Sequence, residues 1–158
     1  KCACYLFHPD YAVRQALFVD SKAEEGGSQT ATLQMSQISM RVRQKRSGKS
    51  IDISGEIEPL IKINDNHYLT TTVFVKYNYR VVQSRKELTG ILVTAVPNGI
   101  LQDTYNPDDN DTIWLAGRDA PTRKEKFRVR LSFDRLKKKA AWRVQVIPMP
   151  PDDFHWNA

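Results

Sequence analysis

Three histidines are the side chains best suited to proton transfer near neutral pH, and they are widely separated in this sequence. His8 lies in the N-terminal segment, His67 lies in a candidate turn and His155 lies in the C-terminal tail. None belongs to a metal-binding spacing, a nucleophile elbow or a Gly-rich phosphate loop. The sequence therefore predicts no catalytic residue, and we expect a protein that is not an enzyme.

Two further groups could in principle hold a metal ion. Cys2 and Cys4 are two residues apart, too close for an unstrained mutual disulfide, and no histidine cluster adjoins them. The acidic stretch 103–111 offers oxygen atoms of the kind that calcium prefers, but it lacks the alternating spacing and the glycine of an EF-hand loop. We expect a solvated turn there, and we predict no metal site and no cofactor.

Basic side chains are concentrated in one part of the chain. The formal net charge is +6, and residues 118–143 contain eleven basic and three acidic side chains. Such a concentration of positive charge attracts anionic partners in a salt-dependent way. The residues that we predict to bind an acidic partner are Arg128, Arg130, Arg135, Lys137, Lys138, Lys139 and Arg143.

The same part of the chain shows the pattern of a β-hairpin. Residues 127–133 and 142–146 alternate apolar and polar side chains on either side of a lysine-rich turn. We expect the rings to face the core and the guanidinium groups to share the opposite face. The rings are those of Phe127, Phe133 and Trp142, and the guanidinium groups are those of Arg128, Arg130 and Arg143. Guanidinium groups on a rigid sheet bind phosphate or carboxylate in a bidentate way, although a solvated face with a protective lysine turn is the simpler alternative.

Nucleic-acid binding needs aromatic rings on the same exposed face as the basic groups, so that bases can stack. In the predicted hairpin the two sets are out of phase. Tyr77 and Tyr79 share the face of Val73 and Val75 and so belong with the core or the sheet edge. The pattern therefore favours a protein partner or another anionic surface over nucleic acid, and a single-stranded nucleic-acid-binding β domain is the first alternative.

The C-terminal residues 148–158 are rich in proline and aromatic side chains. Proline favours an extended conformer that costs little to order, and aromatic anchors often dominate affinity at interfaces. We predict that this tail contacts a neighbouring subunit, with folding back onto its own domain as the alternative. The contact residues are Pro150, Pro151, Phe154 and Trp156.

The elements that would position these residues are mostly strands. Apolar spacing over residues 8–25 predicts one N-terminal helix, and alternation of period two follows from residue 28 onward. Residues 64–66 predict a hairpin turn before a long strand over 68–84, within which we expect a bend or bulge. The fold class is mainly β (α+β): an antiparallel, strongly curved sheet or sandwich of six to seven strands with one N-terminal helix.

With 158 residues, the chain fits a single β-rich domain over residues 1–147 followed by the tail. It contains no apolar run long enough for a transmembrane span. We interpret it as a non-catalytic binding or assembly component of a larger cell-envelope or secreted complex, with a cytoplasmic setting as the alternative. The N-terminal cysteines, the missing initiator methionine and the Thr/Ser/Asn-rich strands favour the envelope. A small-molecule carrier or enzyme with a cavity between helix and sheet is the second functional alternative.

Overall fold

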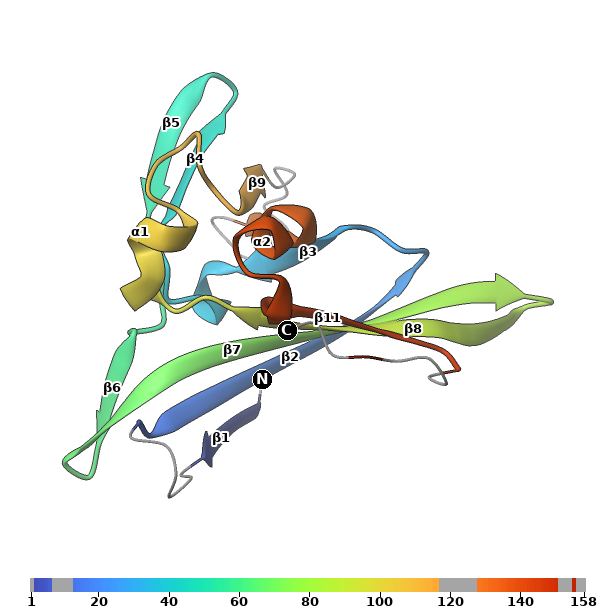
Figure 1. Ribbon diagram of the computed structural model, residues 1–158, viewed down its shortest axis with the longest axis horizontal. Helices are drawn as coiled ribbons and strands as arrows, with labels where there is room; N and C mark the ends of the chain where they lie inside the picture. The colour runs from blue at the N-terminus through green and yellow to red at the C-terminus, as the bar shows by residue number, and fades with distance from the viewer. Residues whose placement is uncertain (1, 7–12, 117–127, 151–154, 156–158) are drawn as a thin grey trace.

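The computed structural model describes residues 2–6, 13–116, 128–150 and 155. Its largest sheet has six strands, in the order β1-β2-β7-β8-β11, with β6 paired to one end of β7 (Figure 1). These strands are β1 (Cys2–Leu6), β2 (Gln15–Glu25), β6 (Leu60–Ile63), β7 (Asn66–Val82), β8 (Arg85–Val96) and β11 (Val144–Pro148).

The predicted N-terminal helix is wrong: residues 15–25 form the strand β2, and residues 7–12 lie outside the described part of the chain. β2 runs parallel to β7 over eleven residue pairs, from Gln15–Leu69 to Glu25–Tyr79, and its other edge pairs with β1. Residues 16–19 of β2 form a continuous apolar run in which Ala16 is buried and the other three side chains are half-buried. Over so short a run, that pattern cannot be distinguished from one face of a helix.

β7 and β8 form a long ribbon that extends beyond the rest of the sheet (Figure 1). The expected irregularity within the long strand is confirmed, because the register shifts between Asn78 and Tyr79. The expected turn before β7 is also confirmed, with Asn64 and Asp65 both at positive φ. The irregularity is expected because the strand is longer than most strands, and the turn is expected because Asn and Asp tolerate positive φ.

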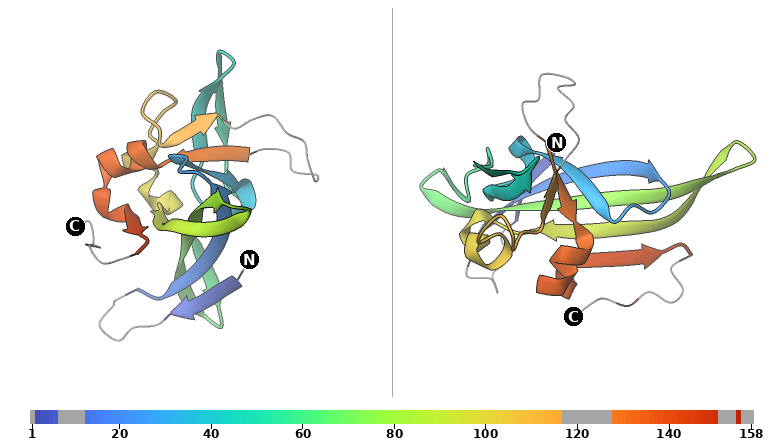
Figure 2. Two further views of the ribbon diagram at one scale, coloured as in Figure 1. Left: turned by 90° about the vertical axis from the view of Figure 1, so that its right-hand side faces the viewer. Right: turned by 90° about the horizontal axis from the view of Figure 1, so that it is seen from above.

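Two smaller sheets and two short helices lie on one side of the main sheet (Figures 1 and 2). The first has the order β3-β10-β9, and the second is the hairpin β4–β5. Their strands are β3 (Thr30–Gln34), β4 (Val42–Arg46), β5 (Lys49–Ile53), β9 (Trp114–Ala116) and β10 (Arg128–Ser132). The helices are α1 (Gln102–Tyr105) and α2 (Phe133–Lys139), and single 3₁₀ turns cover Met35–Gln37, Gly99–Leu101 and Ala141–Arg143.

The hydrophobic core fills the space between the main sheet and this second layer. Phe74 and Leu92 contribute from the main sheet, and Trp114, Leu131 and Leu136 contribute from the other layer. All five side chains are buried. Their burial against one another holds the two layers together, since apolar area removed from water is the main favourable term in folding.

The predicted C-terminal hairpin is wrong. β10 pairs with β3 and β9, whereas β11 pairs with β8 in the main sheet, so the two strands belong to different layers. The lysine-rich segment between them is the last turn of α2, where positive charge is favourable at the negative end of the helix dipole. Ser132 caps the start of α2, its Oγ accepting a hydrogen bond from the backbone N–H of Arg135 at 3.3 Å.

The predicted orientation of the rings holds in part. Val129, Leu131 and Phe133 are buried as expected, but Trp142 is 51% exposed and lies against the guanidinium group of Arg143. Because Trp142 follows a helix and belongs to a 3₁₀ turn, the period-two pattern of a strand does not apply to it. Phe127 lies outside the described residues.

The fold class is therefore confirmed at its coarser level: the chain is mainly β, with several sheets and few helices. The parallel β2–β7 pair contradicts a wholly antiparallel sheet. None of the helices in the described ranges has the length and apolar character needed to span a membrane. The division into residues 1–147 and 148–158 stays a prediction.

Candidate active site on strand β2

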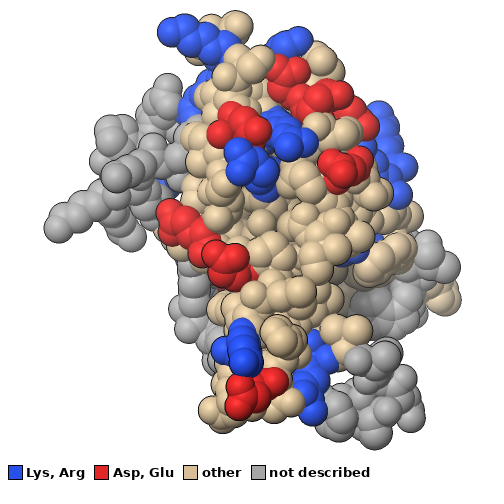
Figure 3. Space-filling model, turned by 90° about the vertical axis from the view of Figure 1, so that its left-hand side faces the viewer, with Lys and Arg blue, Asp and Glu red and all other residues tan. Residues whose placement is uncertain are grey.

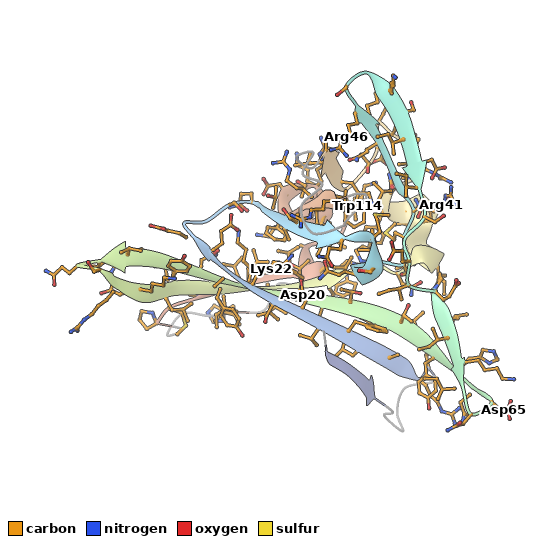
Figure 4. The ribbon with its side chains drawn as sticks, turned by 180° about the vertical axis from the view of Figure 1, so that it is seen from behind. Asp20, Lys22, Arg41, Arg46, Asp65 and Trp114 are labelled. Carbon is orange, nitrogen blue, oxygen red and sulfur yellow. The ribbon has the colours of Figure 1, made fainter. Side chains whose placement is uncertain are left out.

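Asp20 and Lys22 lie side by side near the middle of β2 (Figure 4). Residues two apart on a strand point to the same face, so both side chains leave β2 on one side. Their partners across the parallel pair are Phe74 and Lys76 of β7, whose side chains are buried on the core side of the sheet. The two side chains therefore project from a central strand, and such an element is rigid enough to hold side chains in a fixed geometry.

The two side chains form an ion pair in which neither is fully satisfied. Lys22 Nζ lies 3.6 Å from Asp20 Oδ2 and donates a hydrogen bond to the carbonyl oxygen of Thr32 at 2.6 Å. The Asp20 side chain is 20% exposed, and its buried Oδ2 accepts no hydrogen bond. The Lys22 side chain is 43% exposed. A buried carboxylate oxygen without a donor costs free energy, and such an atom is a candidate for binding a ligand that the free protein does not contain.

Two hollows of very different size adjoin the pair. A cavity of about 210 Å³ is lined by Lys22, Lys76, Ser28 and neighbouring residues of β2, β3 and β7. A smaller recess lies on the other side and is lined by Asp20, Gln37 and Ile57. The second recess has a volume of about 10 Å³, which is room for about one water-sized group, so a larger ligand would approach Lys22 through the first cavity.

Hard divalent cations such as Mg²⁺ prefer oxygen ligands and often bind through one or two carboxylates together with substrate phosphate oxygens and water. Asp20 Oδ2 fits as one such ligand because it is otherwise unpaired. The described residues contain no group of three or more His, Cys, Asp and Glu side chains placed to hold a metal ion. The described part of the chain therefore supplies one carboxylate of such a site rather than a closed ligand set.

The sequence interpretation missed both residues. In a helix, positions two apart point in directions about 200° apart, so assigning residues 8–25 to a helix separated Asp20 from Lys22. The signal that could have found them is an acidic residue two positions before a lysine at the end of an apolar strand, Val19-Asp20-Ser21-Lys22.

The predicted basic residues lie on three successive elements rather than on the two strands of one hairpin. They are distributed over β10, α2 and the 3₁₀ turn that precedes β11. Several hold neighbouring loops: Arg135 donates to the carbonyl oxygens of Thr112 and Trp114, and Arg143 donates to the Tyr105 hydroxyl at 2.7 Å. Lys138 is exposed. The prediction that Arg128, Arg130, Arg135, Lys137, Lys138, Lys139 and Arg143 bind an acidic partner is not tested by their positions.

Two carboxylates of the acidic stretch 103–111 form ion pairs with basic groups of the protein itself. Lys139 Nζ lies 2.7 Å from Asp111 Oδ1, and Lys45 Nζ lies 3.9 Å from Asp109 Oδ1. Backbone N–H groups of Asn110 and Asp111 bond to Asp108 and lower the pKa of its carboxyl group. Acidic and basic side chains accordingly lie next to one another on the face shown in Figure 3. This stretch ties the β4–β5 hairpin to α2.

The remaining predicted site residues are only partly described. Pro150 is exposed, whereas Pro151, Phe154 and Trp156 lie outside the described residues, so the predicted role of the tail stays a prediction. His67 and His155 are exposed and far apart in the sequence. Cys2 and Cys4 lie on β1.

The class of protein follows from comparison with known families. The family model of Type II restriction enzyme SfiI matches residues 1–147, so the chain belongs to the SfiI family of Type II restriction enzymes.

Individual relatives support this assignment. The chain is 34% identical over 165 residues to the Type II restriction enzyme SfiI of Streptomyces fimbriatus, covering 98% of the chain and 58% of that sequence. The crystal structure of tetrameric restriction endonuclease SfiI bound to cognate DNA superposes with a TM-score of 0.77 and 32% identity, over 92% of this chain and 58% of that one. The restriction endonuclease BglI bound to its DNA recognition sequence gives a TM-score of 0.71 over 86% of this chain and 54% of that one. At 21% identity, BglI shows the fold alone. The fold is therefore of the restriction-endonuclease type, and the chain spans 58% of the length of its SfiI relative.

Several predictions are corrected by these findings. The non-catalytic assembly component and the expectation that the protein is not an enzyme are contradicted by membership in a family of restriction enzymes. The preference for a protein partner over nucleic acid is contradicted by the SfiI structure with bound DNA. The cell-envelope or secreted setting gains no support, and the family is consistent with the cytoplasmic alternative.

Proposed function

We propose that the protein is a DNA endonuclease that hydrolyses phosphodiester bonds at Asp20 and Lys22. The observation that carries this proposal is the ion pair itself, on one face of a central strand: a buried carboxylate oxygen that accepts no hydrogen bond lies 3.6 Å from an ammonium group. Family membership supports DNA as the substrate, since the SfiI relative is a restriction endonuclease bound to cognate DNA.

The two side chains have different roles because their charges are opposite. Phosphodiester hydrolysis places additional negative charge on the phosphate oxygens in the transition state, and a fixed ammonium group stabilises that charge. Lys22 Nζ is preorganised for this role by the Thr32 carbonyl oxygen, which leaves two of its three N–H groups for other acceptors. Asp20 Oδ2 would hold a divalent cation. When bound, such a cation supplies Lewis-acid polarisation of the phosphate.

Positive charge elsewhere on the molecule would support DNA binding. Exposed lysines contact phosphate groups as point charges and make affinity depend on salt. We propose that the half-buried Lys137 and the exposed Lys138 at the end of α2 are such contacts, which retains the predicted binding role of these residues with a different partner. We also propose that the protein binds DNA as an oligomer, as its tetrameric relative does, with the tail residues at a subunit contact.

The test is DNA cleavage by the full-length protein in the presence of Mg²⁺. Chromosomal DNA is the suitable substrate, because it presents many more sequences than one plasmid. We expect discrete fragments whose sequenced ends define the cleavage site. We expect Asp20→Asn and Lys22→Met each to slow cleavage by at least about a hundredfold while the variants still bind the cleaved sequence.

The matched controls are Asp65→Asn and Lys62→Met. These residues form an exposed ion pair at 2.8 Å in the β6–β7 hairpin, away from the middle of β2. We expect both controls to cleave at the wild-type rate. Cleavage that survives Asp20→Asn or Lys22→Met, or that falls equally in the controls, would contradict the assignment of the site.

A further inference from the structure

Lys22 lies between two carboxylates but pairs with only one of them. Asp20, Lys22 and Glu24 alternate along β2 and therefore share one face. Each carboxylate starts about 6.6 Å along the strand from Lys22, since a strand rises about 3.3 Å per residue. Lys22 Nζ nevertheless contacts Asp20 at 3.6 Å and the Thr32 carbonyl oxygen at 2.6 Å. Because the two distances along the strand are equal, another factor must determine which carboxylate pairs with the Lys22 ammonium group.

Glu24 is held by Lys76. Lys76 Nζ lies 2.5 Å from Glu24 Oε2 and donates to Ser28 at its carbonyl oxygen (2.8 Å) and its Oγ (2.7 Å). Ser28 Oγ in turn donates to Glu24 Oε2 at 3.1 Å. The three residues therefore form a closed polar cluster beside Lys22, on the wall of the 210 Å³ cavity.

The burial of Lys76 explains why Glu24 forms its ion pair with Lys76 rather than with Lys22. The Lys76 side chain is 1% exposed, while that of Lys22 is 43% exposed and that of Glu24 is 45% exposed. A buried ammonium group loses its hydration and needs a carboxylate, whereas a half-exposed ammonium group is partly solvated by water. The interaction of two opposite charges is also stronger where water is excluded. Glu24 therefore gains more from Lys76 than from Lys22.

We propose that Lys76 is a positioning residue for the nuclease site: it withdraws Glu24 from Lys22, so that the Lys22 ammonium group stays beside Asp20 and free to meet the phosphate. This inference rests on the proposed function. Lys76 lies opposite Lys22 in the register of the parallel β2–β7 pair. Lys22 therefore pairs with Asp20, and Lys76 pairs with Glu24. Without Lys76, Glu24 would keep only the hydrogen bond from Ser28 and would have no cationic partner among the described residues except the half-exposed Lys22, so Asp20 and Glu24 would share the Lys22 ammonium group.

The test compares Lys76→Met with the double variant Lys76→Met/Glu24→Gln in the full-length protein. We expect Lys76→Met to slow single-turnover cleavage at saturating protein by about 10- to 100-fold, because the ammonium group is displaced, with little change in the dissociation constant for DNA. We expect the double variant, which also removes the competing carboxylate, to return to within about threefold of the wild-type rate. A role of Lys76 in anchoring the 26–29 loop alone would leave the double variant as slow as Lys76→Met, and that result would overturn the proposal.

A second measurement does not depend on cleavage. In a crystal structure of the Lys76→Met protein we expect Lys22 Nζ within about 4 Å of a Glu24 carboxylate oxygen. Lys22 still paired with Asp20 alone would overturn the inference. Lys76→Gln, which keeps a donor for Ser28, replaces Lys76→Met in both measurements if the latter does not fold.

The matched control is Lys86→Met, which removes an exposed lysine from the β8 side of the same ribbon. We expect it to cleave like the wild type, and an equal loss in Lys86→Met would overturn the inference. A wild-type protein that cleaves no DNA would contradict the proposed function, and the position of Lys22 in the Lys76→Met crystal structure would still decide the role of Lys76.

Discussion

Substitution of Gly55 tests how residues 55–57, which include Ile57 in the recess beside Asp20, pack against residues 35–40. A Cβ atom added at Gly55 would lie 2.8 Å from the Met40 carbonyl oxygen and would also overlap the carbonyl group of Ile38. These atoms belong to the backbone and cannot turn away as a side chain can. Three backbone hydrogen bonds join residues 55–57 to residues 35–40, at 2.9 to 3.1 Å. Any shift that admits the methyl group must stretch them.

The magnitude follows from these contacts. Forcing extra volume into a packed site costs about 1–3 kcal/mol, and weakening backbone hydrogen bonds worth about 1 kcal/mol each adds to this cost. We therefore expect Gly55→Ala to lower the free energy of unfolding by about 3 kcal/mol. For a domain of this size the midpoint of thermal unfolding should fall by about 6–12 °C. Because Ile57 lines the recess beside Asp20, we also expect a loss of cleavage activity below the unfolding temperature.

The assay is thermal and denaturant unfolding of the wild type, Gly55→Ala and Gly27→Ala. Gly27 is the matched control, since a Cβ atom added there meets nothing within 4 Å. We expect Gly27→Ala to lie within about 1 kcal/mol of the wild type, and to be stabilising if it changes anything. The same small effect in Gly55→Ala would refute the reasoning, because it would show that residues 38–40 yield to the added methyl group at no cost.

Two further predictions concern the β4–β5 hairpin. Asn106 is fully buried; its Oδ1 accepts a hydrogen bond from the backbone N–H of Arg43, and its Nδ2 donates one to the Arg43 carbonyl oxygen, each at 2.8 Å. Asn106→Ala should therefore destabilise the protein by about 2–3 kcal/mol and speed amide hydrogen exchange in β4. Unchanged exchange would contradict this role. Burial alone would raise the pKa of Asp52, but hydrogen bonds and positive charge from Arg41 and Arg43 outweigh it, so the pKa lies below the ordinary value of 3.8. This carboxylate therefore stabilises the fold above pH 3.8 and loses that contribution as the pH falls through its folded-state pKa. The difference in unfolding free energy between the wild type and Asp52→Asn should shrink below pH 3.8, and a constant difference would speak against the pairing.

Much of the secondary structure could be predicted because its signals are local. Alternating side chains predicted strands at residues 68–84 and 88–96, and the structure has β7 and β8 there. The turn at residues 64–66 follows from Asn and Asp side chains that tolerate positive φ. A strand or a turn of this kind depends on residues that are neighbours in the chain, so their pattern is visible in the sequence.

The pairing of the strands could not be predicted in the same way. β2 pairs with β7 in parallel, and β10 and β11 belong to different sheets. The sequence pattern was equally compatible with pairing between segments that follow one another in the chain. Those partners lie far apart along the chain and are selected by burial of apolar faces against one another. The candidate site depended on this choice, because Asp20 and Lys22 point together only if residues 15–25 form a strand.

The sequence by itself determined the composition, the excess of positive charge, the positions of most strands and the burial of residues such as Leu131 and Phe133. Only the tertiary structure decided that β2 is a central strand, that Asp20 keeps a buried oxygen without a hydrogen bond and that Lys76 rather than Lys22 pairs with Glu24. The physical reason is that the energy of a charge depends on how much water surrounds it and on which opposite charge lies nearest. Both quantities are set when distant segments pack together, and neither is a property of any one stretch of the chain.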